Sequence, residues 1–295
     1  MRRAENLAAG SIAVGCIVLA VKGAAWWITG SAALYSDALE TVVNVAASIV
    51  AFAALRLSAK PADANHPFGH EKVEFLSAVV EGALIIVAAI SILEHAWQTW
   101  LDPQPLSAPW LGLGLNAVGG AINFAWAAAL MRAGRTLRSP ALVADARHLR
   151  SDVITSVGVI AGLSLAVLTG VLRLDPLLAA ATAVHILWSG FRLVRESIGG
   201  LMDEAPPTEI VDRVRALVAE NADGALEAHD LRMRYAGRLT FLEFHLVVPG
   251  RMSVADAHDI CDRLEAALKA AMQELVITIH VEPEGKAKHP GVLVL

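Results

Sequence analysis

Six long apolar stretches, separated by short polar segments, occupy the first two thirds of the chain. They lie at about residues 9–29, 33–57, 75–98, 110–131, 153–171 and 175–194. Each approaches the ~20 residues that an α-helix needs to cross ~30 Å of hydrocarbon. We therefore predict six transmembrane helices in a membrane domain of residues 1–203, and we expect the fifth helix to begin near Ala141.

The hydrophobic pattern changes after the sixth stretch, where charged residues become frequent and Pro206 and Pro207 mark a boundary. Periodic apolar positions predict helices at 207–221 and 253–271 and strands at 227–235, 239–248 and 276–281. Ser253 is suited to cap the second helix. The order αββαβ predicts an α+β domain over residues 204–285, with an antiparallel sheet and helices on one face. Residues 286–295 are expected to form a loose tail.

Composition favours a membrane protein and argues against other classes. Hydrophobic residues make up 56% of the 295 residues and the mean hydropathy is +0.54, values that are rare in soluble proteins. The net charge of −5, without a basic stripe, argues against a nucleic-acid partner. Cys16 and Cys261 give no disulfide framework. The first apolar stretch is too long for a cleaved signal, and five more spans follow it.

The basic residues predict how the helices cross the bilayer. Six spans place both termini on the same side of the membrane. The positive-inside rule makes that side cytoplasmic, because basic residues gather there and the opposite loops carry little besides Arg173. The residues on that side are Arg2, Arg3, Lys60, Lys72, Arg132, Arg135, Arg138, Arg192 and Arg195. We expect a multi-pass protein of the cell (inner) membrane with both termini cytoplasmic.

Polar side chains at helical spacing interrupt the second stretch and precede the fifth. Glu40 and Asn44 share one helix face, and so do His148 and Asp152, because residues i and i+4 lie one turn apart. A charged group facing lipid costs roughly 2.5–3.5 kcal/mol or more, so these residues must face a cavity or each other. Two carboxylates, an imidazole and an amide oxygen suit a divalent cation. The alternative is a structural hydrogen-bond network between the two helices.

Three further carboxylates lie close to this set or within a span. Asp37 and Asp145 stand one turn before Glu40 and His148, respectively. Either aspartate can be a ligand, a partner of a ligand or a helix-end cap. Glu81 lies in the middle of the third stretch, where a contact between helices is the favoured interpretation.

A second group of candidate ligands lies in the polar loop between the second and third stretches. Asp63, His66 and His70 are spaced to hold one cation, because Pro67 and Gly69 let the loop fold back on itself. Three such ligands, with water or a fourth group, suit Zn²⁺. The alternative is a solvated turn with incidental histidines.

A third group of candidate ligands belongs to the C-terminal domain. Its members are His229, His245, His258, His280 and Glu282. Their number within one small sheet-helix unit favours a metal site over chance, although local hydrogen bonds could satisfy each histidine by itself. His95, His185 and His289 have no partner at ligand spacing, so we interpret them as non-functional.

Five motifs resemble those of the cation diffusion facilitator family, and in particular its bacterial ferrous-iron/zinc efflux members. The motifs are Ser36-Asp37-Ala38-Leu39-Glu40, His66-Pro67-Phe68-Gly69-His70-Glu71-Lys72, His148-Leu149-Arg150-Ser151-Asp152, Leu201-Met202-Asp203 and His229-Asp230-Leu231-Arg232. The resemblance covers about residues 5–285. It implies six transmembrane helices, a cytoplasmic ferredoxin-like (metallochaperone-like) domain and a homodimer. It also implies export of divalent metal from the cytoplasm against an influx of protons.

The resemblance also assigns roles to the candidate residues. It implies a transport site formed by Glu40, Asn44, His148 and Asp152, a loop site formed by Asp63, His66 and His70, and a third site at the dimer interface formed by His229, His245, His258, His280 and Glu282. Lys72 and Asp203 match a pair that ties the membrane halves of the dimer together. Glu40 and Asn44 stand where the iron/zinc members carry two aspartates. The amide oxygen of Asn44 is uncharged and harder than imidazole, which makes Mn²⁺ or Fe²⁺ candidates beside Zn²⁺.

Two other functions fit parts of the pattern. A membrane metalloenzyme would need an open metal position and a nearby base. Glu71 is the one candidate base, and Glu74 stands where an HExxH helix requires its second histidine. A membrane-anchored metal sensor or scaffold would use the C-terminal ligands without transport. We predict proton-coupled efflux of divalent cations of the zinc, iron and manganese class, with no cofactor beyond bound metal and no enzymatic activity.

Overall fold

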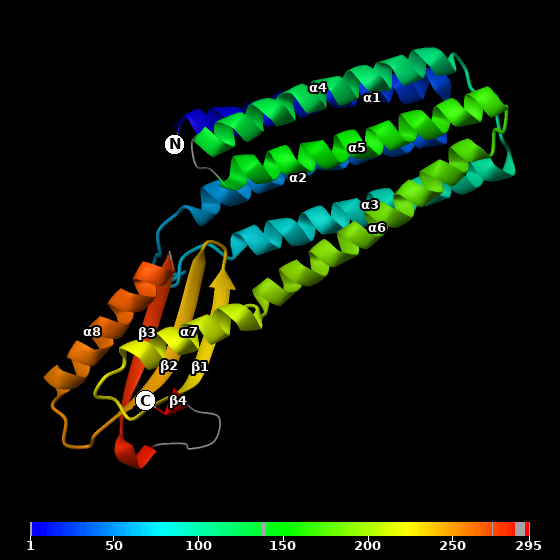
Figure 1. The fold of residues 1–295 in the computed structure, drawn as a ribbon. Coiled ribbons are helices and arrows are strands. Elements are labelled where there is room, and N and C mark those ends of the chain that lie inside the picture. The colour runs from blue at the N-terminus through cyan, green and yellow to red at the C-terminus, as the bar shows by residue number, and fades with distance from the viewer. Residues whose placement is uncertain (1, 137–139, 273, 287–292, 295) are drawn as a thin grey trace. The chain divides into compact units, whose positions relative to one another are not determined.

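The computed structural model describes residues 2–136, 140–272, 274–286 and 293–294 (Figure 1). The chain divides into two compact units. The membrane unit comprises residues 1–56 and 77–195, and the C-terminal unit comprises residues 57–76 and 196–295. The polar loop between the second and third apolar stretches therefore belongs to the same unit as the C-terminal domain.

Six long helices cover the predicted membrane spans. They are α1 (Arg2–Thr29), α2 (Ala32–Ser58), α3 (Val73–Leu101), α4 (Pro109–Thr136), α5 (Pro140–Thr169) and α6 (Leu174–Leu201). Within the described ranges, these helices are the ones long and apolar enough to cross a membrane, which confirms the predicted architecture. Large apolar side chains such as Trp27, Leu168 and Trp188 lie exposed on them, as expected where lipid replaces water.

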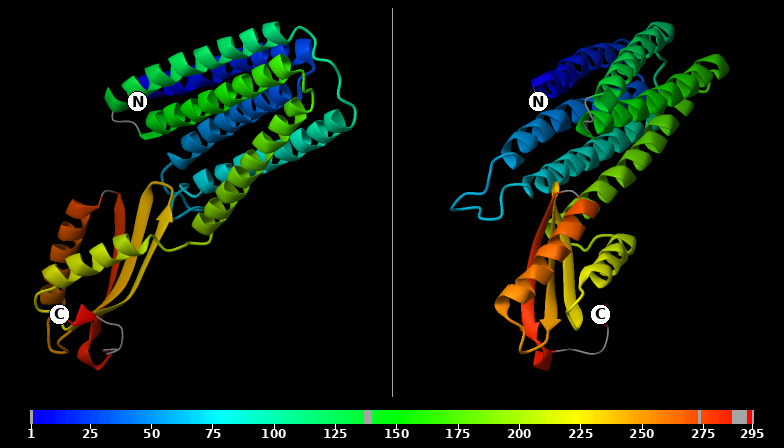
Figure 2. Two further views of the ribbon diagram at one scale, coloured as in Figure 1. Left: turned by 45° about the vertical axis from the view of Figure 1, so that its right-hand side comes forward. Right: turned by 60° about the vertical axis from the view of Figure 1, so that its left-hand side comes forward.

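Two apolar clusters of the membrane unit share α2. One cluster joins α1, α2, α4 and α5 through residues such as Leu34 and Leu163. The other joins α2, α3 and α6 through residues such as Ile92. Figures 1 and 2 show α3 beside α6. A Cβ at Gly82 of α3 would lie 3.0 Å from the carbonyl oxygen of Gly190 of α6, so the glycine allows the two helices to approach closely. The face of α2 between the two clusters is where Glu40 and Asn44 lie.

The C-terminal domain has the predicted element order. Its elements are α7 (Thr208–Asn221), β1 (Glu227–Ala236), β2 (Leu239–Val248), α8 (Val254–Ala271), β3 (Leu275–Pro283), a short 3₁₀ helix (Glu284–Lys286) and β4 (Leu293–Val294). The strand order is β3-β2-β1-β4, and β1 runs antiparallel to β2 and β4. The backbone N–H of Asp256 donates to Ser253 Oγ at 3.1 Å, as the predicted cap of α8 requires.

Two expectations for this domain are corrected by the structure. The prediction of an antiparallel sheet is wrong for β2 and β3, which pair in parallel. The reason is that α8 connects them, and a helical crossover returns the chain to the end of the sheet where the preceding strand began. Part of the expected loose tail is also ordered, because Leu293 and Val294 pair with β1. Residues 287–292 and 295 lie outside the described residues.

Both helices of the domain pack on one face of its sheet. Leu242, Phe244 and Leu246 of β2 are fully buried in a cluster with Val214 of α7 and Leu264 of α8. Because side chains alternate across a strand, the odd-numbered residues of β2 point to the opposite face. That helix-free face carries the histidines of the third candidate site.

Candidate metal-binding sites

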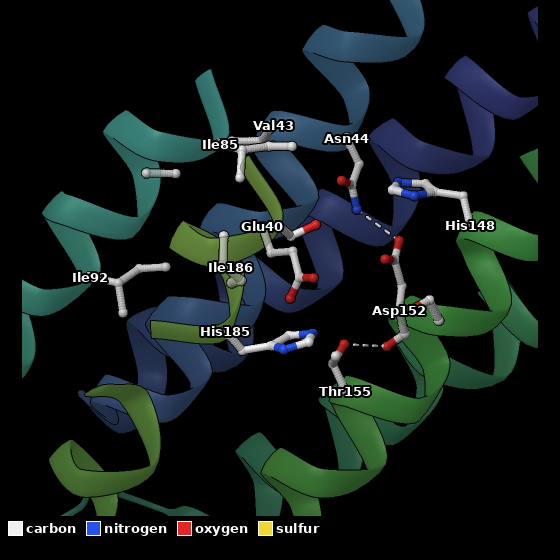
Figure 3. A pocket seen from close by; sticks show the side chains of 13 residues that line it. Glu40, Val43, Asn44, Ile85, Ile92, His148, Asp152, Thr155, His185 and Ile186 are labelled. Carbon is white, nitrogen blue, oxygen red and sulfur yellow. Dashed lines mark hydrogen bonds between the residues drawn. The ribbon is translucent and has the colours of Figure 1, made fainter. Parts of the chain in front are cut away.

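A cavity of about 110 Å³ lies inside the membrane unit between α2, α3, α5 and α6 (Figure 3). Apolar residues of α3, among them Ile85 and Ile92, form one wall. The polar residues that line it are Glu40, Asn44, His148, Ser151, Asp152, Thr155, His185 and Ser189. The structure thus brings the four residues of the expected transport site into one space.

Helical spacing places these side chains in pairs. Glu40 and Asn44 lie one turn apart on α2, and His148 and Asp152 lie one turn apart on α5. The amide nitrogen of Asn44 donates a hydrogen bond of 2.7 Å to Oδ2 of Asp152. Asp152 is buried, Glu40 and Asn44 are half-buried, and His148 is exposed. Two carboxylates that share one cavity repel each other until a cation or protons neutralise them, so the site is suited to exchange one for the other.

Asp37, which the sequence left open as a ligand, forms a buried ion pair with Lys22. Lys22 Nζ lies 2.8 Å from Asp37 Oδ1, and the two side chains are 1% and 2% exposed. The Ser156 hydroxyl donates to the same carboxylate at 3.0 Å. Asp37 therefore joins α1, α2 and α5. Sequence reasoning overlooked Lys22, although a lysine in the middle of the first apolar stretch is itself a signal of a buried partner.

The structure also locates Asp145 and Glu81, the other two carboxylates whose roles the sequence left undecided. Oδ2 of Asp145 accepts a 2.6 Å hydrogen bond from the Ser11 hydroxyl, and Asp145 lines a smaller cavity that also contains His148 and Asp152. Asp145 thus lies close to the expected transport site without lining its main cavity. Glu81 lies on α3 and lines neither of these two cavities.

The loop residues of the second candidate site converge as their spacing predicts. His66 Nδ1 lies 3.2 Å from Asp63 Oδ1, and His70 Nε2 lies 3.5 Å from Asp63 Oδ2. One ligand atom from each residue lies within 4.8 Å of the others. Gly69, with a φ of +89°, turns the chain back where other residues would be strained.

The Asp63 carboxylate is held in its charged form. The backbone N–H of His66 donates to it at 2.7 Å and that of Asn65 at 2.9 Å. The His66 N–H is the main cause that lowers the pKa of the Asp63 carboxyl below its usual value. A charged carboxylate facing two imidazoles is a suitable set of ligands for Zn²⁺.

Arg234 and Lys72 connect the loop to the C-terminal domain. Lys72 Nζ and Arg234 Nη1 lie 2.8 and 3.0 Å from Asp203 Oδ1. The guanidinium of Arg234 also stacks 4.5 Å from the ring centre of Phe241 and 5.9 Å from that of Phe68. The Lys72–Asp203 pair forms within one chain, whereas the family resemblance implied a pair that joins two membrane halves.

Replacing Asp203 with Asn should lower the thermal midpoint slightly at neutral pH. Hydrogen bonding to Lys72 is the main cause that lowers the pKa of Asp203. The stabilisation is therefore present above the unfolded pKa of about 3.9 and is lost as the pH falls through the folded pKa. Since the side chain is 41% exposed, we expect less than about 1 kcal/mol. Thermal scans of the parent and the Asp203→Asn variant in detergent should differ at neutral pH and converge in acid. A gap that persists in acid would contradict the ion-pair explanation.

The third candidate site is a row of three histidines across neighbouring strands. His229 of β1 pairs with His245 of β2, and His245 pairs with His280 of β3. Their ring centres lie 5.2 and 4.8 Å apart. Glu282 lies on the same face. Its carboxylate oxygens lie 3.3 Å from Nε2 of His229, 3.4 Å from Nδ1 of His245 and 3.7 Å from Nε2 of His280. Imidazoles and a carboxylate are ligands that Zn²⁺ accepts, so this row is a candidate metal site.

Burial and hydrogen bonding in this row favour a ligand role. Nδ1 of His229 is hydrogen-bonded to Glu227 at 2.9 Å, which orients the ring and directs Nε2 toward Glu282. That Nε2, Nδ1 of His245 and Oε2 of Glu282 are buried without a hydrogen bond to the described residues. Sequence reasoning missed Glu227, although it stands two residues before His229 in the same strand and side chains two residues apart share one face.

The structure changes the membership of this site. His258 lies on α8, exposed and 3.6 Å from Asp262, on the side of the sheet opposite the histidine row. It cannot join the other ligands of the same chain. Asp230 takes its place as a neighbour, because a ligand oxygen of Asp230 lies within 4.8 Å of ligand nitrogens of His229 and His245. A β-bulge after His229, with a φ of +53° at Asp230, produces this arrangement.

Models of known protein families match nearly the whole chain. Residues 9–202 match the cation efflux transmembrane domain, and residues 206–284 match the cytoplasmic domain of cation efflux proteins. The chain belongs to the cation efflux family, the cation diffusion facilitators. It is therefore a multi-pass membrane transporter of metal cations and not an enzyme, and its C-terminal α+β domain is the cytoplasmic domain of that family.

Two relatives of this cation efflux protein match nearly its full length, and a solved structure matches a shorter part. An uncharacterized transporter of Synechocystis sp. is 42% identical over 282 residues, which is 96% of this chain and 91% of the relative. The cation-efflux pump FieF of Pectobacterium atrosepticum is 33% identical over 276 residues, which is 94% of this chain and 91% of the pump. A solved structure of CzrB in a zinc form is 55% identical and covers 30% of this chain and 99% of its own, with a TM-score of 0.29.

Proposed function

We propose that the protein exports divalent cations of the zinc, iron and manganese class from the cytoplasm in exchange for protons. The observation that carries this proposal is the cavity in which Glu40, Asn44, His148 and Asp152 face one another from two helices. Carboxylate and imidazole ligands bind these metals, and the mixture of hard and intermediate donors fits all three.

Proton exchange follows from the chemistry of the ligands. A carboxylate or imidazole lone pair holds either a proton or a metal ion, so cation binding releases whatever protons the site carries. On the outward-facing side, external protons compete for the same lone pairs and release the metal. Ionisable residues inside membrane helices commonly mark such ion and proton paths.

The proposed orientation places both termini, the loop site and the C-terminal domain in the cytoplasm of an inner-membrane protein. The concentration of basic residues on one side of the six helices supports it. In this orientation the loop site of Asp63, His66 and His70 and the histidine row both face the metal pool that the protein exports. Their role is then to sense or collect cytoplasmic cations.

A homodimer explains why the candidate ligand His258 lies apart from the histidine row of its own chain. His258 cannot reach the histidine row of its own chain, so it contributes as a ligand only when a second copy brings it there. Metal held by His229, His245 and Glu282 of one copy and His258 of another would join two C-terminal domains. We infer that rising cytoplasmic metal stabilises the dimer in this way.

Replacing His245 with Ala should abolish metal-dependent stabilisation of the dimer. His245 stands in the middle of the row and contacts both neighbouring rings. Mass measurement of the full-length protein in detergent, with and without Zn²⁺, tests this. A Thr278→Ala variant, on the same face of β3, serves as the control and should behave like the parent. Loss of transport in the His245→Ala variant at saturating metal would argue against a regulatory role.

Vesicles that contain the purified protein test transport itself. When the proton concentration is higher inside the vesicles than outside, external Zn²⁺, Fe²⁺ or Mn²⁺ should accumulate inside. The alternative is a membrane-anchored metal sensor, which the well-formed histidine row would also suit. Binding of Zn²⁺ at the row without flux of any of the three metals would favour the sensor.

A further inference from the structure

His185 lies in the transport cavity although no spacing rule connects it to the other ligands. It belongs to α6, about 30 residues after the last ligand of α5, and it lines the cavity together with Glu40 and Asp152. Figure 3 shows its ring pointing from α6 into the space that the two carboxylates face. The sequence interpretation of His185 as non-functional is thus at odds with its position.

We propose that His185 is a direct ligand of the transported cation, together with Glu40, His148 and Asp152. The proposal rests on the proposed function and names a donor from a third helix. Two imidazoles and two carboxylates give four protein ligands, the number that Zn²⁺ prefers. In this set His185 replaces Asn44, whose uncharged amide is the weakest donor among the four expected ligands.

Asn44 has a different role in this arrangement. Its amide nitrogen, not its oxygen, faces Asp152 and donates a 2.7 Å hydrogen bond to it. A hydrogen bond to a carboxylate ligand fixes the orientation of that ligand and leaves its other oxygen for the metal. Asn44 is therefore a positioning residue for Asp152, and the fourth ligand position falls to His185.

A structural role for His185 has little support in its surroundings. Within the described part of the chain, no hydrogen bond, ion pair or ring contact is found for its imidazole. His95 on α3 offers a contrast, because its ring stacks 4.5 Å from that of Tyr35 and lies outside the cavity lining. The side chain of His185 is exposed, like that of His148, and a cation bound in the cavity would give its imidazole a partner.

The proposal predicts a specific change in metal preference. Imidazole suits Zn²⁺, whereas Mn²⁺ is served as well by carboxylate and water. Removal of His185 should therefore raise the half-saturating Zn²⁺ concentration by at least about tenfold, since even partners of metal ligands contribute about 10–100-fold in affinity. The value for Mn²⁺ should change much less.

The test is metal-by-metal flux in vesicles for the parent and the His185→Ala, His185→Asn, His95→Ala and Asp152→Ala variants. We expect both His185 variants to lose Zn²⁺ affinity relative to Mn²⁺, and His95→Ala to keep the parental ratio. His185→Asn preserves polarity and keeps the test valid if the alanine variant does not fold, as judged by size-exclusion profile. A parental Zn²⁺ to Mn²⁺ ratio in a folded His185 variant overturns the proposal.

A double-mutant cycle separates a ligand from a nearby wall residue. Asn44→Asp adds a carboxylate beside Asp152, and it should improve Zn²⁺ affinity more in the His185→Ala background, where a ligand position is vacant, than in the parent. Additive effects would mean that the two positions do not share one ion. If Asp152→Ala transports like the parent, the proposed function fails; if only the His185 effects are missing, this inference alone fails.

Discussion

Replacing Asp152 with Ala is expected to abolish metal flux in vesicles that contain the purified protein. Asp152 is buried, lines the main cavity and accepts the Asn44 amide. Its carboxylate supplies charge that neutralises the cation and a lone pair at which metal and proton compete. We expect a loss on the order of 100-fold or more, above what residues that merely support a ligand contribute.

The controls for this variant distinguish loss of the site from loss of the fold. Asp102 is an exposed aspartate that follows α3 and lies outside both cavities, so Asp102→Ala should transport like the parent. Asp152→Asn keeps the size and hydrogen-bonding capacity of the side chain but removes its charge. It should fold like the parent and remain inactive. An active Asp152→Ala variant would exclude this cavity as the transport site.

Replacing Lys22 with Met should destabilise the membrane unit strongly. Lys22 and Asp37 are almost fully buried and lie 2.8 Å apart, and Ser156 completes their hydrogen bonds. Removing one partner leaves a buried charge without compensation, which costs about 3–5 kcal/mol. The thermal midpoint of the variant in detergent should fall by many degrees, well beyond the fall in Lys60→Met, where the lysine is exposed.

A second substitution tests the cause of that loss. Asp37→Asn removes the charge that Lys22→Met leaves behind, so the double variant should recover part of the thermal midpoint. The Ser156 hydroxyl can still donate to the amide oxygen of the new side chain. A double variant as unstable as the sum of the two single variants would show that Lys22 and Asp37 stabilise the fold independently.

The sequence predicted the membrane helices well because their signal is local. Length and apolar content decide whether a segment spans a bilayer, and α5 begins at Pro140, next to the expected Ala141. The parallel pairing of β3 with β2 was missed, since it depends on where α8 returns the chain. The pairing of Leu293 and Val294 with β1 was missed for a similar reason, because it joins segments far apart in sequence.

The candidate sites show the same division between local and distant information. The loop of Asp63, His66 and His70 converges as predicted because all its geometry lies within eight residues. Lys22 was overlooked because its partner Asp37 lies on another helix. His185 was interpreted as non-functional because the polar residues that share its cavity are far from it in sequence. His258 was grouped with the histidine row by composition, but amphipathic packing of α8 places it on the opposite side of the sheet.

The cavity of Glu40, His148 and Asp152 is proposed to exchange a divalent cation for protons. The most direct test measures Zn²⁺ uptake and internal pH together in vesicles loaded with acid. We predict that Zn²⁺ accumulates while the interior becomes more alkaline, that a protonophore abolishes accumulation, and that Asp152→Ala shows neither change. Zn²⁺ accumulation with no movement of protons would contradict the account.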